Sequence, residues 1–155
     1  PGYDPAGLKV SDDPYTIEFA ENLSRDELEE GDRLAPAFDD NGLIPAIAQH
    51  AETREILMFA WMNSDALRRS IETGEAWYFS RSRNELWHKG DTSGQIQDIR
   101  EIRTDCDQDV VLLSVVPRRE GACHVGYRSC FYRSVRRGDD GTISLTFEET
   151  EKVET

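Results

Sequence analysis

The densest group of side chains that could carry chemistry is an acidic segment containing one thiol, Asp105-Cys106-Asp107-Gln108-Asp109. In an extended backbone alternate side chains share a face, so the three aspartates would lie together with the cysteine opposite them. Carboxylates this close repel one another, and a divalent cation that prefers oxygen ligands would relieve the repulsion. An EF-hand is excluded, because its sixth position would be Val110 instead of glycine. The segment indicates either a cation site or a solvated acidic turn.

The three cysteines of the chain, Cys106, Cys123 and Cys130, lie close together in the sequence. Three thiolates leave one position open on a tetrahedral Zn²⁺, as a catalytic zinc that holds water requires. Seven residues separate Cys123 from Cys130, about 10 Å along a helix and more than about 20 Å along a strand, whereas sulfurs on one zinc lie roughly 4 Å apart. A straight element between them therefore excludes a shared metal, and Gly126 could let the backbone fold back. Ordinary buried or free thiols are the alternative, because no C-x-x-C motif is present.

Two histidines are candidates for proton transfer. His124 directly follows Cys123, and His88 lies in the segment LWHKG. A histidine near its unperturbed pKa exchanges protons at neutral pH, as hydrolysis requires. Either residue could instead serve packing or hydrogen bonding, and we expect His50 to lie at the surface.

Cations, hydroxyls and glycines gather between residues 80 and 94, where they could bind phosphate. No Walker spacing is present, and a solvated loop is the alternative. An aromatic side chain here could stack on a purine or belong to the core. The candidate substrate-binding residues are Ser80, Arg81, Ser82, Arg83, Trp87, Lys89, Thr92 and Ser93, with Arg128 further along the chain.

Local signals predict the elements that must position these residues. Ser24 and Glu27 form a capping box that predicts a short helix over 25–30. A second amphipathic helix is expected over 64–73, ended by Gly74. Strands are predicted over 43–49, 55–62, 75–81, 95–104 and 109–116. The expected fold class is α+β: a compact, β-rich single domain with one or two short helices.

Charge divides the 155 residues into three parts. The net charge of −13 disfavours nonspecific binding to nucleic acid or to an anionic membrane. Residues 1–42 sum to −9, residues 43–137 to +1 and residues 138–155 to −5. We therefore expect an acidic N-terminal arm over 1–40, a domain over 41–137 and an acidic C-terminal tail over 138–155.

The longest apolar run, Ile56 to Met62, is too short to cross a membrane. The first residues lack the pattern of a secretory signal, although one could have been removed before Pro1. Three cysteines, an odd number, favour a reducing compartment over a disulfide framework. We therefore expect a cytoplasmic protein.

Four strings together resemble the phosphoribosyl-AMP cyclohydrolases of histidine biosynthesis in order, spacing and residue identity. The strings are ILMFAWMN (56–63), ETGEAWYFSRSRNELWHKGDTSG (72–94), EIRTDCDQD (101–109) and GACHVGYRSCFYR (121–133). The resemblance extends over about residues 41–133. It implies hydrolysis of the N1–C6 bond in the adenine ring of N1-(5-phosphoribosyl)-AMP, giving the formimino carboxamide ribonucleotide.

The resemblance also implies two metals and a partner chain. In that family the cysteines of D-C-D and C-H-x-G-x-R-S-C bind zinc, and the three aspartates of D-C-D-x-D bind Mg²⁺. The family forms an intertwined homodimer whose zinc ligands come from both chains, which offers a way round the spacing problem above. Carried onto this sequence, the zinc ligands are Cys106, Cys123 and Cys130, and the magnesium ligands are Asp105, Asp107 and Asp109.

The implied chemistry suits the residues. Zinc-bound water becomes acidic enough to add to C6, and the departing N1 needs a proton. His124 is the first candidate for that proton transfer and His88 the second, while Arg and Lys side chains of 80–94 with Arg128 would hold the two phosphates. Two alternatives are a zinc nucleoside deaminase, although its H-x-E and P-C-x-x-C signature is absent, and a noncatalytic module stabilised by zinc.

Overall fold

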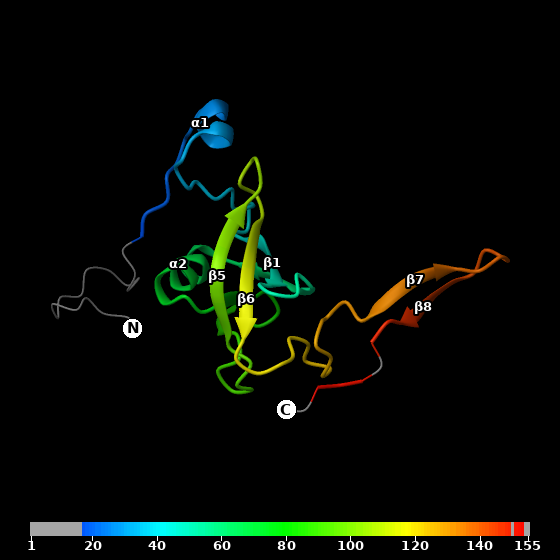
Figure 1. Ribbon diagram of the computed structural model, residues 1–155. Coiled ribbons are helices and arrows are strands. Elements are labelled where there is room, and N and C mark those ends of the chain that lie inside the picture. The colour runs from blue at the N-terminus through cyan, green and yellow to red at the C-terminus, as the bar shows by residue number, and fades with distance from the viewer. Residues whose placement is uncertain (1–16, 150, 154–155) are drawn as a thin grey trace.

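The computed structural model describes residues 17–149 and 151–153, and its centre is a six-stranded sheet (Figure 1). The strand order is β4-β3-β2-β1-β6-β5, and only β1 and β6 run parallel to one another. An isolated bridge joins Glu75, just before β3, to Asp98 of the edge strand β5. The strand bounds are β1 Ile44–His50, β2 Ile56–Met62, β3 Trp77–Ser80, β4 Glu85–His88, β5 Gln97–Thr104 and β6 Val111–Pro117.

The core lies on one face of this sheet, beneath the second helix. Side chains alternate along β1 and β6, so every second one is removed from water. Tyr78 of β3 and Leu67 of the helix complete the apolar cluster. The predicted β-rich α+β domain is therefore confirmed. The buried strand residues are Ile44, Ala46, Ala48, Val111, Leu113 and Val115.

Helix α2, Ser64–Thr73, has the bounds that its end signals predict. The Asn63 side chain accepts a hydrogen bond from the Ala66 amide at 2.8 Å, and Gly74 ends the helix in the left-handed conformation with φ 72°. Ser70 fastens the helix to β3, because its hydroxyl accepts from the Trp77 amide at 2.9 Å. The helix thus fixes where β3 begins.

Helix α1, Arg25–Glu30, begins with the predicted capping box of Ser24 and Glu27. None of its residues is buried. It lies beside the loop that joins β5 to β6 (Figure 1). Its attachment to the domain therefore depends on polar contacts, such as the hydrogen bond from the Gln108 side chain to the Leu28 carbonyl at 3.1 Å.

Two strands form a hairpin that the sequence analysis did not predict. β7, Arg133–Arg137, pairs with β8, Ile143–Phe147, and projects away from the main sheet (Figure 1). Asp140-Gly141 at its turn is a hairpin signal that could have revealed it. The hairpin crosses residue 138, where the sequence analysis began the acidic tail. Its apolar side chains Val135, Ile143, Leu145 and Phe147 are all at least half exposed.

Among the helices of the described residues, none has the length and apolar character needed to cross a membrane.

Gly90 should be far less tolerant of substitution than Gly42. Both have a positive φ, +87° and +75°, but a Cβ at Gly90 would overlap the backbone of Gln95 and Ile96, whereas nothing lies within 4 Å of one at Gly42. We expect Gly42→Ala to lower the free energy of unfolding by about 1–2 kcal/mol, the cost of left-handed backbone. Gly90→Ala should cost about 4 kcal/mol or more. Urea unfolding measures both, and equal losses would contradict the proposed overlap.

Candidate active site

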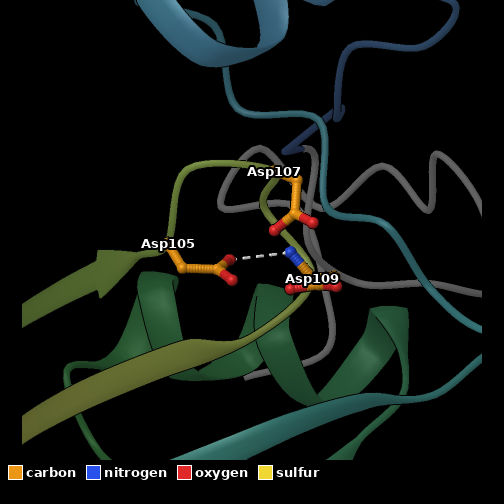
Figure 2. Close-up of side chains that lie close together, drawn as sticks. All are labelled: Asp105, Asp107 and Asp109. Atoms are coloured by element: carbon orange, nitrogen blue, oxygen red, sulfur yellow. Dashed lines mark hydrogen bonds between the residues drawn. The ribbon is translucent and has the colours of Figure 1, made fainter.

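The three aspartates converge in the loop between β5 and β6 (Figure 2). One carboxylate oxygen from each lies within 4.8 Å of the others. Asp105 accepts hydrogen bonds from the backbone amides of Asp109 at 2.9 Å and Val110 at 3.2 Å. The segment is a turn, so the expectation of an extended backbone was wrong: Gln108 adopts a left-handed conformation with φ 57°. The turn, and not strand alternation, brings the carboxylates together.

Repulsion within this cluster changes its protonation. Hydrogen bonds to Asp105 and Asp107 raise the pKa of Asp109 to about 6. Burial acts to raise the pKa of Asp105, but hydrogen bonds from Asp109, Asp107 and the backbone amides outweigh it and lower the pKa of that carboxyl. Without a cation the cluster therefore retains a proton at mildly acidic pH. Exposed, converging carboxylate oxygens suit a hard divalent cation such as Mg²⁺, which keeps several of its waters.

The second cluster is a thiol pair beyond the other end of β6. The chain reverses between Cys123 and Cys130, where the Gly126 amide donates to the Cys123 carbonyl at 3.0 Å and Gly126 has φ 113°. The predicted fold-back at this glycine is confirmed. The Cys130 amide donates to the Leu57 carbonyl at 2.7 Å, which fixes the pair against β2. Burial, together with the adjacent Cys123 thiol, raises the pKa of Cys130 to about 12.

Lys89 places a cation close enough to the thiol pair to interact with both cysteines. Its ammonium group is buried and donates to the Ala122 carbonyl at 2.8 Å. It also lies 5.6 Å from the ring centre of Trp87. Burial lowers the pKa of Lys89, while Cys130 and Cys123 act in the opposite direction. A positive charge therefore lies where two thiolates would need one.

Cys106 lies far from this pair within one chain. It precedes β6 and Cys123 follows it, and the seven residues of that strand span about 23 Å. In the described part of the chain, the only group of three metal-ligating side chains is the aspartate cluster. The structure thus brings together two of the three predicted zinc ligands. One chain alone supplies a thiol pair at one end of β6 and a single thiol at the other.

The two candidate histidines lie in different surroundings. His124 is exposed and adjacent to Cys123. His88 stacks on Trp77, with ring centres 4.4 Å apart, and its Nε2 lies 2.8 Å from a Glu75 carboxylate oxygen. Glu75 also accepts from Arg118 at 2.9 Å. Sequence reasoning did not foresee this network, because its partners come from distant segments.

The sequence suggested that residues 80–94 form a single loop. They do not, because β4 passes through them. The pairing of Trp77–Ser80 with Glu85–His88 makes a hairpin. Ser80, Arg81, Ser82 and Arg83 belong to its turn, where the Ser80 hydroxyl accepts from the Arg83 amide at 3.3 Å. Thr92 and Ser93 lie beyond β4, where the Ser93 carbonyl accepts from Arg119 at 3.2 Å. The candidate phosphate ligands therefore form two separate groups.

Two further candidates already have protein partners. Arg128 donates to both oxygens of Glu55, at 2.7 and 3.2 Å, and to Glu149 at 2.9 Å. The hydrogen bond to Glu55 raises the pKa of Arg128 further. Trp87 is half-buried and packs at an angle against Tyr78, with ring centres 5.5 Å apart. It thus belongs to the edge of the core, the alternative that the sequence left open.

Comparison with known proteins identifies the family. The family model for phosphoribosyl-AMP cyclohydrolase matches residues 58–132, a range that includes both clusters. A phosphoribosyl-AMP cyclohydrolase of Caulobacter vibrioides is 62% identical over 121 residues, 77% of this chain and 87% of that protein. Proteins of the same name from Nitrobacter winogradskyi and Bradyrhizobium diazoefficiens are 51% and 52% identical, over 84% and 82% of this chain and 89% of each relative. The chain belongs to the phosphoribosyl-AMP cyclohydrolase family.

Proposed function

We propose that the protein hydrolyses the N1–C6 bond in the adenine ring of N1-(5-phosphoribosyl)-AMP, a step of histidine biosynthesis. The observation that carries the proposal is the 62% identity to a relative named for this activity, over 87% of its length. The aspartate cluster and the thiol pair both lie within the matching range. We include a cytoplasmic location in the proposal, since the odd number of three cysteines favours a reducing compartment.

The reaction adds water to C6 and breaks the N1–C6 bond, so that N1 leaves as part of an amidine. Alkylation of N1 makes C6 electron-poor, which favours the addition. One proton must leave the attacking water and one must reach N1. Exposed His124, beside the thiol pair, is our first candidate for transferring a proton between the water and N1. His88 is the second, and its pairing with Glu75 would have to be relieved first.

Zinc fits the thiols if two chains contribute. Cys123 and Cys130 would come from one chain and Cys106 from its partner, because β6 separates them within a chain. When bound, zinc supplies an acidified water for hydrolysis. Lys89 would balance the charge of the neighbouring thiolates. The three donors leave one position open, as a catalytic site requires.

An intertwined homodimer is the partner arrangement that this ligand set needs. The exposed apolar side chains Val135, Ile143, Leu145 and Phe147 of the β7–β8 hairpin support it, because a second chain would remove them from water. Neither nucleic acid nor membrane is proposed as a partner. The small substrate would instead engage the cations of the site.

Magnesium fits the aspartate cluster, and we assign it there. Asp105, Asp107 and Asp109 would hold it through carboxylate oxygens. Of the candidate phosphate ligands, the end of β3 offers half-buried Ser80, the β3–β4 turn offers exposed Arg81, Ser82 and Arg83, and the loop beyond β4 offers exposed Thr92 and Ser93. Buried Lys89 and half-buried Trp87 would contact the substrate on the side nearer the protein core. Arg128 would have to release one of its glutamate partners, Glu55 or Glu149, to bind a phosphate.

The purified protein should open the ring of phosphoribosyl-AMP in the presence of Zn²⁺ and Mg²⁺, and a chelator should abolish this. The ultraviolet change on ring opening measures it, and no turnover with both metals would overturn the proposal.

Cys123→Ser should lose zinc, measured by metal analysis, together with activity. Release of ammonia would indicate a deaminase, since ring opening releases none. A fourth protein ligand in metal-site spectroscopy would indicate a noncatalytic zinc module.

His124→Ala should retain bound zinc and lower kcat by about 100-fold or more, the usual contribution of a positioned acid–base group. His88→Ala is the matched comparison. It removes the contact with Glu75 and the stacking on Trp77, so we expect it mainly to lower the midpoint of thermal unfolding. Full kcat in His124→Ala would refute the shuttle role of that residue, and selective loss of kcat in His88→Ala would transfer the role to His88.

Asp109→Asn should stabilise the metal-free protein at pH 8 and remove the stabilisation that Mg²⁺ gives. The pKa of Asp109 in the folded protein, about 6, lies above the ordinary aspartate value of 3.8. This carboxyl therefore contributes stability at low pH and loses it as the pH rises through about 6. Thermal unfolding at pH 5 and pH 8, with and without Mg²⁺, measures the effect. Exposed Asp91→Asn is the control, and an equal response of the two variants would contradict the cluster's role.

A further inference from the structure

Gln108 differs from the aspartates on either side of it. Its neighbours Asp107 and Asp109 are exposed, whereas Gln108 is only 6% exposed. Its φ of 57° is uncommon for a residue with a side chain. This conformation turns the loop so that the amides of Asp109 and Val110 reach the Asp105 carboxylate. The buried residue thus sets the geometry of an exposed cluster.

The side chain of Gln108 forms three hydrogen bonds, all to one distant segment. Its Oε1 accepts from the Ala35 amide at 2.8 Å, and its Nε2 donates to the carbonyls of Leu28 at 3.1 Å and Arg33 at 3.2 Å. Its backbone carbonyl accepts from the Ala37 amide at 2.7 Å. All four partners are backbone groups within residues 28–37, which we call the arm strap. One residue therefore fastens the strap to the aspartate loop.

The strap begins within α1, and the helix adds little apolar packing to it, because α1 has no buried residue. A groove of about 390 Å³ lies between the strap and the aspartate loop. Leu28 and Arg33 line it from the strap, and Asp105 and Cys106 line it from the loop. The position of the strap therefore defines one wall beside both a magnesium and a zinc candidate ligand.

We propose that Gln108 is a positioning residue, which uses the arm strap to hold the aspartate cluster ready for a divalent cation. The inference rests on the assignment of magnesium to that cluster. Left-handed backbone costs about 1–2 kcal/mol and three converging carboxylates repel, so the isolated loop would relax. Four hydrogen bonds, each worth about 1 kcal/mol, oppose that relaxation. The N-terminal arm thereby becomes part of the metal site.

Gln108→Met tests the proposal, because methionine has a similar length and meets the same backbone demand but can form none of the side-chain hydrogen bonds. We expect the Kd for Mg²⁺, measured calorimetrically, to rise about 10- to 100-fold, the usual effect of losing a residue that orients metal ligands. In the metal-free protein, hydrogen exchange of the Asp109 and Val110 amides should quicken about 10-fold or more. Ser24→Ala, which breaks the α1 capping box but spares the strap, should change neither measurement.

Unchanged exchange and unchanged Mg²⁺ affinity in Gln108→Met would overturn the proposal, and so would tighter Mg²⁺ binding, which would make the strap an obstruction. If the wild-type protein binds no Mg²⁺, the magnesium assignment fails separately, and the exchange measurement still decides whether Gln108 holds the loop. If Gln108→Met does not fold, Gln108→Gly replaces it. Glycine adopts a positive φ without strain, so slower exchange in that variant would also contradict the role of the hydrogen bonds.

Discussion

Strand β6 imposes the constraint on which the rest of the site depends, because it keeps two groups of candidate metal ligands apart. The aspartate cluster and Cys106 precede it, and the thiol pair follows it. Hydrogen bonding to β1 and β5 on either side fixes the strand in the sheet. A chain cannot shorten the distance without unfolding its core. Any zinc site using all three cysteines must therefore be completed by a second chain.

The arm strap meets the aspartate loop through neutral groups. The strap belongs to residues 1–42, which carry a net charge of −9, and the loop presents three carboxylates, so direct electrostatics would drive the two segments apart. The contact instead consists of the neutral amide of Gln108 and backbone groups of the strap. Hydrogen bonds between neutral groups allow two acidic segments to lie side by side. They also leave the carboxylates free to face a cation.

What the sequence predicts well is local. Ser24, Asn63 and Gly74 act on residues within one helical turn, so both helices have the predicted bounds. Gly126 likewise reverses the chain between its own neighbours. Strands β4, β7 and β8 were missed because short strands are defined by their partners. The role of Gln108 was equally hidden, since its side-chain partners lie 73 to 80 residues away. Spacing points to the candidate ligands, whereas the residue that we propose to position them can be recognised only in the fold.

Charge balance explains why a buried lysine lies beside the thiol pair. Burial lowers the pKa of Lys89, whereas negative charge on Cys130 and Cys123 would raise it. The raised pKa of Cys130 favours its protonated form, which takes one of those negative charges away. Three thiolates around Zn²⁺ would leave a net charge of −1, because cysteine binds metal as thiolate. Lys89 would offset that charge, so the burial of the lysine would cost less free energy in a zinc-bound protein than in a metal-free one.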